Sequence, residues 1–102
     1  MRYNQHMERY FEWDDRKAGS NFHKHGIQFE EAALAFDDPF AVSEQDRIED
    51  GEQRWQTIGM VGGCLLLLVA HTVPLEDESI EVVRIISARR ANRKERRLYE
   101  HG

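Results

Sequence analysis

One run of apolar residues limits, more than any other feature, the folds that this chain can adopt. Residues 64–72 are CLLLLVAHT, and the first seven of them are apolar. Seven residues are far fewer than the roughly 20 that a membrane-spanning helix needs. A run of this length and composition is typical of a central strand buried on both faces of a sheet. Gly62 and Gly63 precede it and predict a hairpin turn from an earlier strand at residues 55–61.

The segments around this run predict the rest of the sheet. Residues 73–79 are polar and contain a proline, so we expect a loop there, followed by a strand at residues 80–88. Short connections of this kind join antiparallel neighbours. We also expect a short edge strand at residues 40–43. Residues 44–52 include six charged side chains, which predicts a solvated loop.

Capping residues place the first helix. Aromatic residues at 9–13 suit a short strand that follows a frayed tail at residues 1–8. Asp14 is positioned as the N-cap of a helix over residues 15–25. Gly26 is then positioned to end that helix in the left-handed conformation.

Two further helices follow from periodicity and composition. An apolar stripe predicts a second helix over residues 28–36, formed by Phe29, Ala32, Ala33 and Phe36. A basic third helix is expected over residues 91–101. The prediction is therefore an α+β fold in a single domain, residues 1–102. It has two N-terminal helices, one C-terminal helix and a mostly antiparallel sheet of about four strands.

The charge of the chain is concentrated in one segment. The net charge is −5, but residues 84–97 carry seven basic side chains and one acidic side chain, a local +6. Six of the seven are arginines, which hold phosphate in a bidentate fork. The segment therefore predicts an anionic partner, with a merely solvated helix as the alternative.

Arg84 and Arg89 are the candidate phosphate ligands. In a regular strand they would lie on opposite faces, so a bulge or the end of the strand must bring them together. The alternative for Arg84 is an ion pair with Glu12 or Glu81, because arginine is rarely buried without a partner. Arg89 would share a helical face with Arg93 and Arg97 only if the last helix began at Arg89.

Several classes of chemistry lack the residues that they need. Cys64 is the single cysteine, so neither a disulfide nor a cysteine-based zinc site can form within the chain. The five histidines are scattered, and the chain has no glycine-rich phosphate loop and no serine nucleophile motif. We therefore expect no metal and no cofactor. The absence of an apolar N-terminal stretch favours a reducing, cytoplasmic location.

Six segments, in order, resemble the BrnT family over about residues 11–100. They are Phe11-Glu12-Trp13-Asp14 with Lys17 and Asn21; Lys24-His25-Gly26; Phe29 to Ala32 and Phe36 to Pro39; Glu52 to Trp55 with Ile58-Gly59; His71-Thr72; and Arg84 to Ala91 with Glu95 to Tyr99. The resemblance implies a ribonuclease toxin of a bacterial type II toxin–antitoxin pair, with a RelE-like fold and an action that inhibits translation. It also implies a ribbon-helix-helix antitoxin of the BrnA type, in a complex with two copies of each chain.

RNA cleavage without a metal needs a base, an acid and cations around the phosphate. With Arg84 and Arg89, we consider His71 as acid or base at a strand end, or else as a structural histidine. Tyr99 either stacks on a base or donates a proton, or else packs the last helix on the sheet. Candidates for binding the RNA are Lys24, His25, Arg90, Arg93 and Arg97, although Lys24 and His25 also suit a helix C-terminus. The competing hypothesis is a non-catalytic module that binds nucleic acid or an acidic protein through the basic segment.

Overall fold

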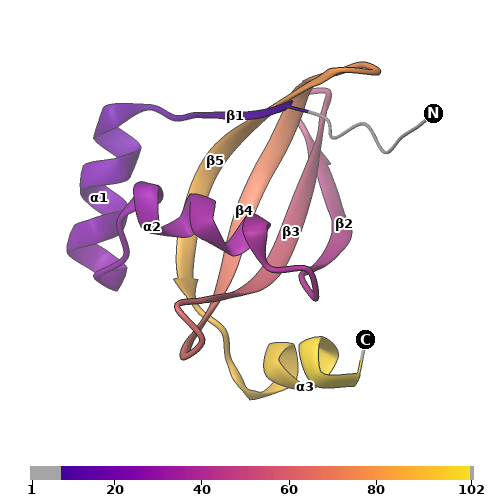
Figure 1. Cartoon of the computed structure of the whole chain (residues 1–102). Coiled ribbons are helices and arrows are strands. Elements are labelled where there is room, and N and C mark those ends of the chain that lie inside the picture. The colour runs from indigo at the N-terminus through magenta and orange to yellow at the C-terminus, as the bar shows by residue number, and fades with distance from the viewer. Residues whose placement is uncertain (1–7, 102) are drawn as a thin grey trace.

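The computed structural model describes residues 8–101 of the chain as a mixed sheet with helices on one face and at one end (Figure 1). The elements are β1 (Glu8–Glu12), α1 (Asp15–His25), α2 (Phe29–Ala33), the 3-10 helix η1 (Leu34–Asp37), β2 (Val42–Glu49), β3 (Glu52–Val61), β4 (Leu65–Glu76), β5 (Ile80–Arg90) and α3 (Arg93–His101). Of the tail expected at residues 1–8, all but Glu8 lies outside the described residues, and Glu8 begins β1.

The α+β class is confirmed, but the sheet has five strands and not four. Its order is β1-β5-β4-β3-β2. The four later strands pair antiparallel, whereas β1 pairs parallel with β5. The sequence prediction missed this pair because it counted strands joined by hairpins, while β1 and β5 come from opposite ends of the chain.

The first helix follows its capping residues. One carboxylate oxygen of Asp14 accepts hydrogen bonds from the backbone N–H groups of Arg16 and Lys17, at 2.8 and 3.1 Å. Gly26 ends the helix with φ 72°, which is favourable only without a Cβ. The N-cap and the C-terminal glycine are thus confirmed.

The second helix differs from its prediction. The expected helix over residues 28–36 is a five-residue α2 that tightens into η1. Short 3-10 turns commonly close an α-helix, and Pro39 prevents any longer continuation. The apolar stripe was correct as a buried face, since Phe29 and Ala32 are fully buried.

Strands extend further than predicted at both ends of the sheet. The long strand β2, Val42–Glu49, takes in the second half of the expected edge strand at 40–43 and most of the expected loop at 44–52, and it turns into β3 at Asp50 and Gly51. The expected loop at 73–79 is mostly the end of β4. Both segments lie beyond the core, so their backbones pair while their polar side chains stay exposed. Apolar periodicity could therefore not reveal them.

The central strand β4 is buried on both faces, as the apolar run predicted. Leu67 and Val69 face α1 and α2 in a core with Ile27, Phe29, Ala32, Ala35, Val83, Ile85 and Ala88. Leu66 and Leu68 face the other side and pack with Ile58, Met60, Ala91 and Tyr99. Figure 1 shows α2 and η1 crossing one face of the sheet, while α3 lies at one end.

Gly59 supports a close approach between β3 and η1. A Cβ at this position would lie far inside van der Waals contact of the Ala35 carbonyl oxygen. We expect Gly59→Ala to lower the free energy of unfolding by about 1–3 kcal/mol or more, because backbone must move. Gly19→Ala is the matched control, since Gly19 lies in α1 with nothing within 4 Å. Gly19→Ala should raise the free energy of unfolding by about 1 kcal/mol, measured in the same urea titration. Equal effects of the two changes would contradict this account of Gly59.

Candidate nucleic-acid interface

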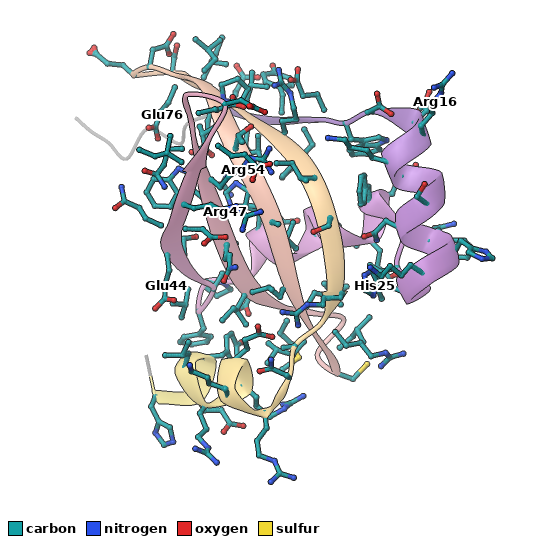
Figure 2. All side chains as sticks on the ribbon, turned by 180° about the vertical axis from the view of Figure 1, so that it is seen from behind. Arg16, His25, Glu44, Arg47, Arg54 and Glu76 are labelled. Atoms are coloured by element: carbon teal, nitrogen blue, oxygen red, sulfur yellow. The ribbon has the colours of Figure 1, made fainter. Side chains whose placement is uncertain are left out.

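The face of the sheet opposite α2 and η1 carries the candidate site, and we call it the open face. Figure 2 views the molecule from this side, with Arg54 and Arg47 lying over the strands. Leu68, Ala70 and Thr72 of β4 point to this side, because Leu67, Val69 and His71 point to the helices.

A β-bulge decides which residues of β5 reach the open face. Ile85 pairs with His71 and Ser87 pairs with Ala70, so Ile86 is an extra residue without a partner on β4. The extra residue reverses the alternation. Arg84, opposite Thr72, and Arg89, opposite Leu68, consequently lie on the same face. Their partners are four residues apart on β4, a separation of about 13 Å.

Arg84 lies in a group of polar residues at the middle of the open face. Its Nε donates to Glu12 Oε2 at 2.7 Å, and its Nη1 is 3.9 Å from Glu52 Oε2. The ion pair with Glu12 is one of the two alternatives that the sequence left open. Glu81, the other, pairs with Arg9 instead.

Arg54 and Thr72 belong to this group, although sequence reasoning assigned neither a role. Trp55 pairs with His71 between β3 and β4. Arg54, one residue before Trp55, therefore lies beside Thr72, on the side of Thr72 opposite Arg84. Thr72 is fully buried, and neither its hydroxyl nor the Arg54 Nε has a hydrogen-bond partner among the described residues. Both residues lie in segments that carry the family resemblance. That resemblance is the one signal in the sequence that could have identified them as site residues.

Arg89 holds the last helix against the sheet. Its two terminal nitrogens each lie 2.8 Å from a carboxylate oxygen of Glu95. The hydrogen bond from Arg89 lowers the pKa of the Glu95 carboxyl. Glu95 also accepts from the Asn92 backbone, while the Asn92 side chain accepts from the Glu95 backbone, which forms a reciprocal cap. The helix therefore begins at Arg93, and Arg89 does not share a helical face with Arg93 and Arg97.

The sequence predicted His71 at a strand end, but the residue lies inside β4 on the helix-covered face. It is 4 % exposed, and its Nε2 is 2.7 Å from the Thr57 hydroxyl oxygen. The Phe36 ring packs edge-to-face on it. Burial lowers the pKa of His71 to about 4, so the imidazole is neutral at pH 7. The sheet separates it from Arg84 and Arg89.

Tyr99 connects α3 to Asp38, the residue that follows η1. Its hydroxyl donates to Asp38 Oδ2 at 2.6 Å, and that carboxylate also accepts from the Met60 and Phe40 backbones. The hydrogen bond to Asp38 raises the pKa of Tyr99. Its ring packs against the Ile58 cluster, which is the packing alternative considered for this residue. Asp38 was predicted only to end a helix.

The five candidate RNA-binding residues lie in two places. Lys24 and His25 are at the end of α1, and the others, at the end of β5 and on α3, are Arg90, Arg93 and Arg97. Among residues 8–101, no carboxylate lies within 4 Å of the Lys24 or arginine cations of this set. Arg84 and Arg89, in contrast, are both paired.

A family model for the ribonuclease toxin BrnT of type II toxin–antitoxin systems matches residues 13–95 of the chain. The chain belongs to the BrnT family. The crystal structure of the Brucella abortus ribonuclease toxin BrnT is similar to this one, with a TM-score of 0.56 and 21 % sequence identity. The match covers 85 % of this chain and 100 % of that one. A search of curated proteins gives no match.

Two further observations on this BrnT-family chain concern metal binding and membrane-spanning helices. Within residues 8–101, no three or more His, Cys, Asp or Glu side chains gather as a metal ion would require. None of the helices in the same part of the chain is both long enough and apolar enough to cross a membrane.

The buried His71 makes stability depend on pH. Its pKa is about 4 in the folded state and near 6.5 when unfolded, so the unfolded state binds more protons between these values. We expect the free energy of unfolding to fall by up to about 3 kcal/mol as the pH drops from 6.5 to 4. Urea titrations of the wild type and His71→Gln across this range measure it. Carboxylates titrate in both proteins, so the difference between the two pH profiles isolates His71. Parallel profiles would show that its pKa is not lowered.

Proposed function

We propose that this protein is a metal-independent endoribonuclease that binds the scissile phosphate on the open face. The observation that carries the proposal is the pair of guanidinium groups, Arg84 and Arg54, which lie on either side of the buried Thr72 on the open face. Two guanidinium groups together offer the charged donors that a phosphate oxyanion needs. Membership of a family of ribonuclease toxins supports RNA as the substrate.

The proposed chemistry uses the 2′-hydroxyl of the RNA as nucleophile. Glu52, whose carboxylate lies 3.9 Å from the Arg84 guanidinium, accepts the proton of this hydroxyl. The 2′-oxygen bonds to phosphorus while the bond to the 5′-oxygen breaks. Arg84 and Arg54 stabilise the negative charge of the pentacovalent state. The leaving 5′-oxygen takes a proton from solvent, which reaches the exposed open face.

The other candidate residues receive supporting roles in this proposal. Arg89 is bound to Glu95 on both of its terminal nitrogens, so it positions α3 and touches no phosphate unless that pair opens. His71 and Tyr99 maintain the sheet and the docking of α3. The cations Arg90, Arg93 and Arg97, with Lys24 and His25, contact the RNA backbone away from the cleaved bond.

We also propose that the protein acts as a toxin in the cytoplasm by cutting RNA needed for translation. A BrnA-like ribbon-helix-helix antitoxin neutralises it, in a complex with two copies of each chain. Arg93 and Arg97 of α3, which have no carboxylate within 4 Å among the described residues, support contact with an acidic segment of that partner. The family's membership in type II toxin–antitoxin systems supports the existence of such a partner.

A second hypothesis, a non-catalytic binding module, is favoured by two observations. Both arginines first selected from the sequence are already paired with carboxylates, and the buried His71 faces away from them. Such a module would bind RNA or an acidic protein and leave RNA intact.

Purified protein incubated with total RNA separates the two hypotheses. We expect cleavage that persists in EDTA, because the proposed chemistry uses only side chains. Arg84→Gln should lower the cleavage rate about a hundredfold or more, since one transition-state donor is worth roughly 3 kcal/mol. Gel analysis of the RNA over time measures both.

Arg47→Gln is the matched control, because Arg47 is also an exposed arginine paired with a carboxylate on the same sheet. It should cleave as the wild type does. Circular dichroism should show both variants folded, because a surface ion pair contributes little stability. Intact RNA under every condition would favour the binding module, and activity that EDTA abolishes and magnesium restores would contradict the metal-independent mechanism.

The antitoxin interface has its own test. Arg93→Glu with Arg97→Glu should weaken binding of the antitoxin and reduce the dependence of the association rate on salt, which stopped-flow mixing measures. The matched control is Arg16→Glu with Lys24→Glu on α1, which changes the charge equally on another surface. If the control weakens binding and the α3 variant does not, the partner covers the N-terminal helices instead.

A further inference from the structure

A basic groove lies between α1 and the edge of β5, outside the site at Arg84. Its volume is about 300 Å³. We call it the α1–β5 groove, and its lining residues are Arg16, Lys17, Ser20, Asn21, Lys24, His25, Ile86 and Ser87. Figure 2 shows His25 on the side of α1 that faces β5 and Arg16 at the other end of the helix.

The helical repeat explains why so many polar residues meet here. The lining residues of α1 recur at intervals of four, which places them on one face of the helix over about 12 Å. Asn21 anchors that face to β5. Its buried amide donates to the Ala88 and Ile27 carbonyl oxygens and accepts from the Ala88 backbone N–H. The wall of the groove is therefore held rigidly against the strand.

The charges of the groove differ from those of the open face. No carboxylate lines it, and within residues 8–101 the side chains of Arg16, Lys17 and Lys24 form no ion pair. On the open face, in contrast, Arg47, Arg54 and Arg84 each lie within 4 Å of a carboxylate. In a chain with net charge −5, unpaired cations gathered around two serine hydroxyls form a surface suited to anions.

The groove continues into the open face around the edge of β5. Ser87 lines the groove and follows Arg84 on the same face of the strand. Their partners on β4, Ala70 and Thr72, are two residues apart, a separation of about 7 Å. The charge of Lys17 also acts on a carboxylate at the end of β2. The hydrogen bond from Arg47 and the charges of Arg54, Arg47 and Lys17 together lower the pKa of Glu49 at the end of β2.

We propose that the α1–β5 groove is a second phosphate-binding subsite, which holds the backbone of single-stranded RNA beside the phosphate bound at Arg84. This inference rests on the proposed ribonuclease function and names the path of its substrate. Arg16, Lys17 and Lys24 supply the positive charge, and the hydroxyls of Ser20 and Ser87 donate to phosphate oxygens. The groove contacts no reacting atom, so it acts on substrate binding and not on the chemical step.

The test measures binding separately from cleavage. The probe is a fluorescent single-stranded RNA with 2′-O-methyl groups, which removes the nucleophile, and anisotropy gives its affinity between about 50 and 200 mM salt. We expect Arg16→Gln with Lys24→Gln to weaken binding. The slope of log K against log salt should become shallower by about 1.4, or about 0.7 for each of two lost phosphate contacts. On a cleavable RNA, KM should rise with little change in kcat.

Two controls make the result specific. Lys94→Gln with Arg96→Gln removes the same charge from exposed positions on α3 that we assign no role, and should leave the slope unchanged. The charge-preserving Arg16→Lys with Lys24→Arg should restore binding.

The groove is not a subsite if the glutamine variant binds with the wild-type slope, or if the α3 control loses as much affinity. Cleavage that remains in that case would leave the ribonuclease proposal standing. Binding that depends on the groove without any cleavage by the wild type would instead overturn the ribonuclease proposal and retain an RNA-binding groove.

Discussion

The extra residue in β5 at Ile86 determines how this protein presents its charges. Without it, Arg84 and Arg89 would lie on opposite sides of the sheet, and one of them would point into the apolar core beneath α2. With it, both reach the open face while Val83, Ile85 and Ala88 stay buried. The Asn21 amide binds Ala88 just beyond the bulge, where β1 no longer pairs with β5. The same amide positions α1, so the open face and the basic groove depend on one local irregularity.

Ion pairing with carboxylates divides the described cationic side chains into two groups. Arg9 and Arg84 connect strands that are distant in sequence, through Glu81 and Glu12, and Arg89 connects β5 to the following helix α3 through Glu95. An arginine bound in this way is already oriented, but it must share or exchange its carboxylate before it can bind phosphate. Arg16 and Lys24 of α1 and Arg93 and Arg97 of α3 have no such restriction among the described residues. This division favours a site in which Arg84 acts on one phosphate while unpaired cations hold the neighbouring backbone.

Among residues 8–101, no exposed histidine lies on the strands of the sheet face where phosphate would bind. His71 is neutral and buried, and the Tyr99 hydroxyl donates its hydrogen bond to Asp38. Catalysis on the open face would therefore rely on guanidinium groups and carboxylates. Guanidinium groups keep their charge at all physiological pH values, which suits the stabilisation of a phosphate transition state.

The sequence by itself determined the local elements. Asp14 and Gly26 set the ends of α1, the glycine pair set the β3–β4 turn, and the apolar run made β4 the centre of the sheet, because caps, turns and burial depend on neighbouring residues. The family resemblance was equally accessible, since it rests on ordered motifs. Only the tertiary structure decided the pairing of β1 with β5, the bulge at Ile86, the partners of Arg84 and Arg89, and the burial of His71. Most of these join residues far apart in the chain, whereas the Arg89–Glu95 pair depends on where α3 begins. A one-residue shift in strand register also reverses which side chains are buried.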